Sequence, residues 1–419
     1  MTDVPQLGRI VLNSCHPNAS EDMRRRILPR LHQDDVADIL SLDDLLIIYG
    51  NNLCEKYKEQ HLALMIKSRL RLMTRVYIAA KAINYTILDL KSMINPQMYK
   101  TFIQAIHKVA EFDEETDRYK KPNVASSIRT LMKDIVDIFI NKCIMTMEDK
   151  KQKTAGNFLH LHSKLFRIRV NNTAKNSKIE LNRRKIIQLP SLHDIKTLLQ
   201  YTKSLRHSAL KKSDAHGFSY PVFKVLAETC LLGMMIFNQR RPGEMQMVEV
   251  QDFKLHSTID ERTNKELFQS MSKQARKALV QYVRFSIRGK LNRPVTVVLC
   301  QDLLHSAKTI LHHREEANIP ASNKYIFELP SQDAKKDKLL DACHLMRKYS
   351  KACGAKEPHL LRAKKLRKHI ATTCLQLKVT AMAMTKTSLL RKNAIVIKTR
   401  LLTKQVSHQM KVWRGRIHK

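Results

Sequence analysis

Apolar residues recur every three or four positions through most of the first 170 residues, the spacing that builds one face of an α-helix. The basic residues Lys67, Arg71 and Arg75 fall on other faces of one such predicted helix. Its apolar positions are Leu62, Ile66, Leu70, Met73 and Tyr77. The pattern predicts a helical domain over residues 21–170, preceded by a loose arm over residues 1–20.

Two local signals mark helix boundaries inside this first domain. Ser41 stands three residues before Asp44, an arrangement that resembles a capping box at the start of a helix. The charged stretch 111–121, followed by Pro122, interrupts the periodic pattern, and a second periodic segment begins near Ile128. We therefore expect separate helices on either side of each signal.

The stretch 171–190 is polar and basic, has no period of apolar residues and ends in Pro190. It predicts a basic linker and the main domain boundary of the chain. Ser191 follows directly, and a serine before a new periodic segment is a typical helix N-cap. We expect a second domain over residues 191–377.

This second domain contains the best strand signals in the chain. Apolar and polar residues alternate from Val283 to Ile287, the sequence GKLN follows as a turn, and Pro294 opens a returning apolar strand. A proline near the start of that strand suits the edge of a sheet. We predict a mainly α fold, in which a helical N-terminal domain precedes an α+β domain with a small antiparallel sheet.

The chain is strongly basic, with 76 Lys and Arg against 38 Asp and Glu and a formal net charge of +38. Such an excess repels itself unless a polyanion shares it, and nucleic acid is the usual polyanion. The eight cysteines form no C-x-x-C pair, which favours a reduced intracellular protein without a zinc site. No run of about 20 apolar residues predicts a membrane span.

Two histidine pairs are candidates for chemistry, but neither has the further ligands that a metal site needs. We interpret His160 and His162 as residues of a polar helix or loop. We interpret His312 and His313 as surface residues. The sequence therefore predicts no metal site.

Three clusters of basic residues follow one another in the second domain, the first after an apolar helix, the second at the hairpin turn and the third on a predicted helix. Their residues are Arg240, Arg241 and Glu244 in the first, Lys290 in the second, and Lys364, Arg367 and Lys368 in the third. Arginine binds phosphate oxygens through parallel hydrogen bonds and keeps its charge. Lysine can donate a proton to a leaving oxygen. The clusters together predict a phosphate site.

The order of these clusters resembles the tyrosine recombinases, or phage integrases, and most closely those of eukaryotic mobile elements of the Crypton type. The first box, RRPGE, implies Arg241 as the catalytic arginine, with Glu244 as its acidic companion. The hairpin implies Lys290 as the catalytic lysine, and the box KKLRKHIAT implies Arg367 as the second arginine. The resemblance extends over about residues 35–377.

The resemblance implies an enzyme that breaks and rejoins DNA, as happens in DNA recombination and DNA integration. A tyrosine attacks the DNA phosphate and leaves a 3′-phosphotyrosyl link, while the arginines neutralise the transition state and the lysine protonates the departing 5′ oxygen. No metal, nucleotide or other cofactor is implied, because the covalent link keeps the bond energy. Arg240 and Lys368 would support the same phosphate site.

Two features depart from the family pattern. Lys364 stands at the histidine position of the family's H-x-x-R motif, and lysine is a poorer proton shuttle near neutral pH. Residues 378–419 form a divergent basic tail without tyrosine, aspartate or glutamate, and the last tyrosine of the chain is Tyr349. No nucleophilic tyrosine is found, so we expect a DNA-binding protein whose catalysis is impaired.

Two other functions remain open at this point. The chain could be an active site-specific recombinase whose C-terminus is misread, or a basic helical module that binds RNA or another protein. The main hypothesis implies double-stranded DNA as the partner and a nuclear location, and it allows a homo-oligomer on the DNA. It implies neither a membrane nor a small-molecule substrate.

Overall fold

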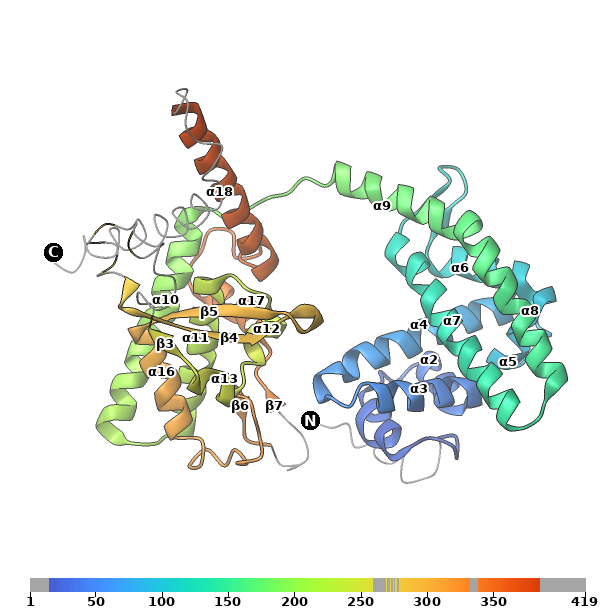
Figure 1. Ribbon diagram of the computed structural model, residues 1–419, viewed down its shortest axis with the longest axis horizontal. Coiled ribbons are helices and arrows are strands. Elements are labelled where there is room, and N and C mark those ends of the chain that lie inside the picture. Colours follow the sequence, from blue (N-terminus) through green and yellow to red (C-terminus); the bar gives the residue numbers. More distant parts are fainter. Residues whose placement is uncertain are drawn as a thin grey trace. The chain divides into compact units, whose positions relative to one another are not determined.

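The computed structural model describes residues 15–258, 279–331 and 338–384, with the backbone alone from 374 onward, and a few isolated positions between 269 and 276. The chain divides into two compact units, Met1–Ile186 (unit 1) and Ile187–Lys419 (unit 2), whose elements are labelled in Figure 1. The predicted fold class, mainly α with a helical N-terminal part and small antiparallel sheets, is confirmed.

Unit 1 is a bundle of helices with one short hairpin. Its α-helices are α2 (Asp35–Leu42), α3 (Asp44–Lys56), α4 (Ala63–Ile83), α5 (Leu90–Met93), α6 (Tyr99–Val109), α7 (Pro122–Met145), α8 (Asp149–Phe166) and α9 (Asn172–Arg184). Short π and 3-10 turns are η1 (Met23–Ile27), η2 (Leu28–Arg30), η3 (Gln60–Leu62), η4 (Pro96–Met98) and η5 (Arg167–Asn171). The hairpin pairs β1 (Phe112–Asp113) with β2 (Arg118–Tyr119) in the predicted charged break.

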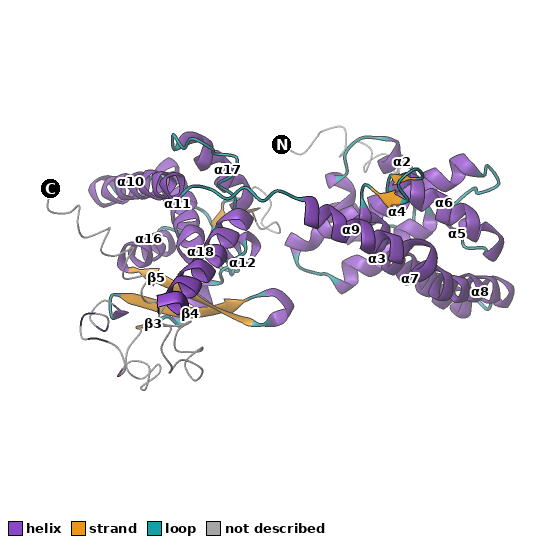
Figure 2. Ribbon diagram, turned by 90° about the horizontal axis from the view of Figure 1, so that it is seen from above, coloured by secondary structure: helices purple, strands orange, loops and turns teal. Residues whose placement is uncertain are grey.

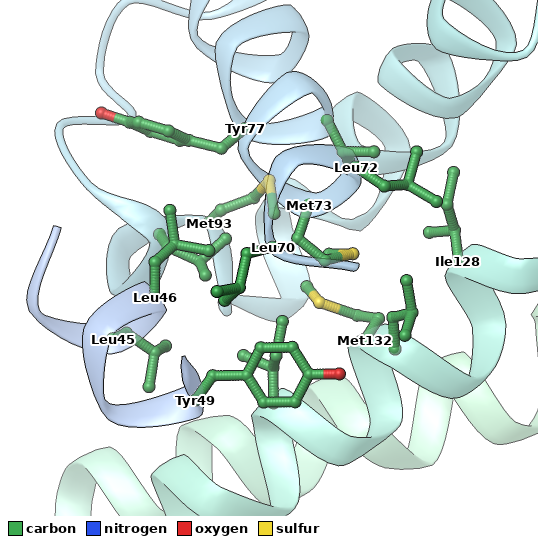
Figure 3. Close-up of a cluster of buried hydrophobic side chains, with 14 of the residues drawn as sticks. Leu45, Leu46, Tyr49, Leu70, Leu72, Met73, Tyr77, Met93, Ile128 and Met132 are labelled. Atoms are coloured by element: carbon green, nitrogen blue, oxygen red, sulfur yellow. The ribbon is translucent and has the colours of Figure 1, made fainter. Parts of the chain in front are cut away.

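The core of unit 1 forms where α3, α4 and α7 meet. Figure 3 shows Leu45, Leu46 and Tyr49 of α3 turned toward Leu70 of α4 and Met132 of α7. All five of these side chains are at most 1% exposed, and their burial with the rest of the core stabilises the unit. The predicted apolar face of α4 is thus confirmed from residue 66 to residue 77.

The predicted basic outer face of α4 is only partly correct. Arg75 is exposed, as expected, but Lys67 and Arg71 are half-buried. Arg71 forms an ion pair with Asp34, and Lys67 donates to the backbone carbonyl of Arg30. These two cations therefore hold α4 against the start of the unit, because their partners come from segments that sequence spacing does not reveal.

The predicted capping box at Ser41 is wrong. Ser41 lies in the last turn of α2, where its hydroxyl donates to the Ala37 carbonyl at 2.8 Å. The N-cap of α3 is Asp43, which accepts from the N–H of Leu46 at 2.8 Å and from the N–H of Leu90 at 2.9 Å. One buried carboxylate thus accepts one open N–H group from each of two helices, through its two oxygens.

Two predicted irregular segments are more ordered than expected. Residues 1–14 of the predicted arm lie outside the described residues, but Cys15 and Ala19 are buried in the core of unit 1. The division between the units, after Ile186, falls inside the predicted linker 171–190, but helix α9 occupies most of that stretch. That helix packs through the small residues Ala174 and Ser177, which a search for large apolar residues misses.

Unit 2 combines helices with small sheets. Its helices are α10 (Leu192–His216), α11 (Tyr220–Asn238), α12 (Pro242–Gln246), α13 (Val250–Lys254), α16 (Gln301–His312), α17 (Ala342–Ala352) and α18 (Ala363–Met384). Its strands are β3 (Ser257–Thr258), β4 (Tyr282–Arg288), β5 (Pro294–Cys300), β6 (Glu328–Leu329) and β7 (Lys338–Leu339). The main sheet has the antiparallel order β3-β4-β5, and Figure 2 shows α10, α11 and α16 on one side of it.

The predicted hairpin and the second helix cap are confirmed. Strands β4 and β5 pair in register from Tyr282 opposite Cys300 to Arg288 opposite Pro294, and Pro294 lies on an edge strand. Ser191 caps α10 by accepting from the N–H of Asp194 at 3.0 Å. Helix α18 continues past the predicted domain end at residue 377, while residues 385–419 of the predicted tail lie outside the described residues.

Helix α11 runs through the core of unit 2. Among the described helices, it alone is long and apolar enough to cross a membrane by length and composition, yet 67% of its apolar window is buried within the unit. Gly233 in its middle lets α10 and α16 approach closely, since an added Cβ would lie 2.8 Å from both Arg206 Nη1 and Leu303 Cδ2. Its last turn leads directly to the first basic cluster.

Candidate functional site

The first basic cluster begins where α11 ends. Gln239 closes the helix in the left-handed region, with a φ of 52°, and its N–H donates to the Met235 carbonyl at 2.8 Å. A residue with a side chain costs about 1 kcal/mol in this conformation, so surrounding contacts must hold it there. The turn carries Arg240 and Arg241 out of the helix, and Pro242 then starts α12.

Asn238 supplies the contact that holds this turn. Its side-chain amide donates to the Val298 carbonyl at 2.9 Å and accepts from the Val298 N–H at 2.8 Å. Arg240 adds a hydrogen bond from Nη2 to the Thr296 carbonyl at 3.2 Å. The end of α11 is therefore fixed to the middle of β5. Sequence reasoning missed Asn238, because nothing local shows that a strand lies beside it.

Glu244 joins the first cluster to the hairpin. Its Oε1 accepts from Arg241 Nη1 at 2.5 Å and from the backbone N–H of Lys290 at 3.3 Å. Arg241 and Lys290, which the sequence analysis assigned to one site, thus meet at a single carboxylate. We call Arg241, Glu244 and Lys290 the Arg241 corner.

The electrostatics of the Arg241 corner keep Glu244 charged. Burial alone would raise the pKa of this carboxyl, because Glu244 is only 8% exposed. Hydrogen bonds from the Arg241 guanidinium and the Lys290 N–H outweigh that effect and hold the pKa of Glu244 below its ordinary value. At neutral pH Glu244 is therefore an anion that orients the guanidinium, and the Arg241 side chain remains 49% exposed.

The hairpin turn places Lys290 beside Glu244. Gly289 donates its N–H to the Arg293 carbonyl at 2.8 Å, and residues Lys290–Asn292 form a single 3-10 turn between them. A Cβ at Gly289 would lie 2.4 Å from Val295 Cγ2 and 2.9 Å from the Arg293 oxygen, so the turn requires glycine. The Lys290 side chain itself is exposed.

The third basic cluster lies on α18, which packs against α11. Leu366 anchors the helix, with 1% exposure in the core of unit 2, while Lys364 is exposed and Arg367 and Lys368 are half-buried. Within the described part of the chain, no hydrogen bond or ion pair joins these three cations to the Arg241 corner. The structure therefore brings Arg241, Glu244 and Lys290 together, and it places Arg367 on a neighbouring helix.

The tyrosine nearest in sequence to the third cluster has a structural role. Tyr349 of α17 is 4% exposed, and its hydroxyl donates to Glu228 at 2.8 Å. Burial and the adjacent carboxylate both raise the pKa of this phenol, which opposes formation of a nucleophilic phenolate. Lys348 donates to the same carboxylate at 2.5 Å, so the buried Glu228 side chain has two hydrogen-bond partners.

The interpretation of two histidines as polar or surface residues is wrong. His162 is 2% exposed and packs among aromatic rings of unit 1, with the Phe166 centroid 4.7 Å away. His313 is half-buried. Its Nε2 lies 3.2 Å from Ser213 Oγ, and its Nδ1 lies 2.9 Å from Glu316. Across the described residues, no group of three His, Cys, Asp or Glu is arranged to hold a metal ion.

Comparisons with known proteins add no relative to this picture. No protein-family model, no curated protein and no solved structure matches the chain.

Proposed function

We propose that this chain is a DNA-binding protein with a tyrosine recombinase-like core, in which the Arg241 corner receives a DNA phosphate that no tyrosine of the chain attacks. The observation that carries the proposal is the double hydrogen bonding of Glu244. It joins the Arg241 side chain to the backbone of Lys290, a residue 46 positions after Glu244, and both Arg241 and Lys290 were selected from sequence as phosphate ligands.

The side chain of Arg241 suits this role chemically. A guanidinium has five N–H donors in a planar fork, and the contact with Glu244 uses Nη1. The carboxylate fixes the plane of the fork, so the half-exposed guanidinium can meet a phosphate with little loss of side-chain freedom. Lys290 is exposed on the adjoining turn and would add a second cation.

The proposed role is binding of duplex DNA without strand cleavage. No tyrosine follows Tyr349 in the sequence, and Tyr349 itself is buried against Glu228. A covalent phosphotyrosyl step in the family's pattern would need a tyrosine after the third basic cluster, where this sequence has none. The excess of basic residues supports DNA as the partner, since a positive field accelerates encounter with a polyanion, and DNA as the partner supports a nuclear location.

Fluorescence anisotropy with a labelled duplex tests the binding role. Arg241→Ala should weaken binding about tenfold, the order expected for one lost charged contact. Lys211→Ala removes one exposed cation from α10 in the same unit and is the matched control, with an expected change below about twofold. Equal effects of the two variants, or tighter binding to RNA of the same length, would contradict the proposal.

A suicide substrate tests the absence of cleavage. The duplex carries a bridging phosphorothiolate, so that any attacking tyrosine stays covalently joined to the DNA. We expect no protein–DNA adduct on a denaturing gel with the 419-residue chain. An adduct would show that a tyrosine of this chain is a nucleophile and would favour an active recombinase.

A further inference from the structure

A groove in unit 1 runs along the seam between α7 and α8 and has a volume of about 710 Å³. The two helices are joined by a short loop and run antiparallel, so residues far apart in sequence face each other across the seam. Arg129, Thr130 and Lys133 line it from α7. On α8, Gly156 lies opposite the cations of α7, where a larger residue would fill the space.

Gly156 keeps the groove open. It lies in the middle of α8, where glycine weakens a helix relative to alanine. A Cβ added at Gly156 would meet no atom within 4 Å, so neither packing nor backbone conformation requires glycine here. The residue lowers helix stability without a structural reason in its surroundings, and its visible consequence is the empty space above it.

The lining of the groove is suited to an anion. Arg129 and Lys133 are one helical turn apart on α7, and His160 stands on the facing helix. The hydroxyl of Thr130 adds a neutral donor, whereas the hydroxyl of Ser163 donates to the His160 carbonyl at 2.8 Å. No carboxylate is among the lining residues, so nothing in the groove neutralises these cations. A guanidinium, an ammonium and a hydroxyl in one hollow are groups that bind phosphate oxygens.

The floor of the groove is rigid. His162 lies there, 2% exposed, and its Nε2 is 3.0 Å from the backbone carbonyl of Arg129. Its ring stacks parallel to Phe158, with 8° between the planes, and meets Phe166 edge-on. Arg129 is therefore anchored to α8 through its backbone, so its side chain starts from a fixed point on the groove wall.

We propose that this α7–α8 groove is a phosphate-binding site in its own right, separate from the Arg241 corner. The ligand is a phosphate group, carried either by a nucleic-acid backbone or by a small polyphosphate. The inference goes beyond the proposed function because it depends on no residue of unit 2 and on no likeness to recombinases.

The test uses the full chain and two probes, tripolyphosphate followed by calorimetry and a labelled DNA duplex followed by anisotropy. Gly156→Leu fills the groove without changing the charge, and Arg129→Ala with Lys133→Ala removes its cations. Lys175→Ala with Lys178→Ala removes two exposed cations of α9, outside the groove, and is the control for charge. Gly156→Ala is the control for the helix, and thermal unfolding checks that each variant is folded.

We expect Gly156→Leu and the double groove variant to weaken binding of at least one probe tenfold or more, while both controls stay within twofold of the unchanged chain. A loss confined to tripolyphosphate identifies a small polyphosphate as the ligand, and a loss confined to the duplex identifies a nucleic-acid backbone. If both groove variants bind both probes as the controls do, the proposal is wrong. Arg241→Ala, measured alongside, reports on the proposed function independently.

Discussion

The two units of the protein differ in how much positive charge they carry. Residues 1–186 contain 32 Lys and Arg against 21 Asp and Glu, whereas residues 187–419 contain 44 against 17. Unit 2 thus holds most of the excess, although the units are of similar size. A larger excess of cations makes the field around unit 2 more positive than that around unit 1.

The contacts of individual cations show the same difference. In unit 1, Asp44 accepts from Lys91 at 2.5 Å and from Lys142 at 2.9 Å, and these contacts lower the pKa of Asp44 well below its usual range although burial opposes them. In unit 2, Lys364 and Arg367 have no carboxylate partner among the described residues. Lys91 and Lys142 therefore hold helices of unit 1 together, whereas unit 2 contains both paired cations, such as Arg206 with Asp302, and cations without such a partner.

The largest expected effect on stability comes from breaking the paired cations of unit 1. Asp44→Ala removes the shared partner of Lys91 and Lys142, and the free energy of unfolding should fall by about 2 kcal/mol. Urea unfolding followed by circular dichroism measures this loss. Glu55→Ala, an exposed acid of the same helix, should change the value by less than about 0.5 kcal/mol. A similar small change for Asp44→Ala would remove the contrast between the units.

Substitution of Asn238 tests whether polar contacts beside the Arg241 corner stabilise the fold of unit 2. Asn238→Ala leaves the Val298 N–H and carbonyl without their side-chain partner and should destabilise the protein by about 1.5 kcal/mol. Arg240→Ala, which loses one exposed hydrogen bond to Thr296, should cost under about 0.5 kcal/mol. Thermal unfolding of the two variants gives the comparison, and a reversed order would mean that Asn238 does not hold the turn.

His162 makes the stability of unit 1 depend on pH. Burial lowers the pKa of His162 in the folded protein, so below about pH 6.5 the unfolded chain binds a proton that the folded chain resists. The contribution of neutral, buried His162 to the free energy of unfolding is complete above that pH. As the pH falls, this free energy decreases by at most about 1.4 kcal/mol per pH unit. His162→Phe should flatten the urea-unfolding profile between pH 7 and pH 5. Parallel profiles for the two proteins would show that His162 does not titrate on unfolding.

Two helical glycines give the smallest expected effects, with opposite signs in the two units. Gly156→Ala should stabilise the protein by about 0.5 kcal/mol, because its Cβ enters open space in α8. Gly233→Ala should destabilise it, because its Cβ would lie 2.8 Å from Arg206 Nη1 in the core of unit 2. Melting temperatures of the two variants decide the signs.

Features set by neighbouring residues could be predicted from the sequence. The alternation from Val283 to Ile287 gave the hairpin, Ser191 gave a helix start, and the spacing around Leu70 gave the buried face of α4. Each depends on residues within a few positions of one another. The same is true of the junction between Arg241 and Glu244, which are three residues apart.

Features set by distant partners could not be predicted. Asp43 accepts from the first N–H of a helix that begins 47 residues later, and Asn238 binds a strand residue 60 positions away. Helix α9 was missed because it packs through Ala174 and Ser177, which give no apolar period. His162 was read as polar because its aromatic neighbours come from other helices as well as its own. For Asp43 and Asn238 the decisive partner is absent from the local sequence.

The salt dependence of duplex binding tests the central claim, that Arg241 contacts a DNA phosphate. The slope of log affinity against log salt concentration should be smaller by about 0.9 for Arg241→Ala than for the unchanged chain, the value for one lost phosphate contact on duplex DNA. The melting temperature should fall by only a few degrees, because Glu244 loses the guanidinium but keeps the N–H of Lys290 as a partner. An unchanged slope with weakened binding, or a large loss of thermal stability, would contradict the account and make Arg241 a structural residue.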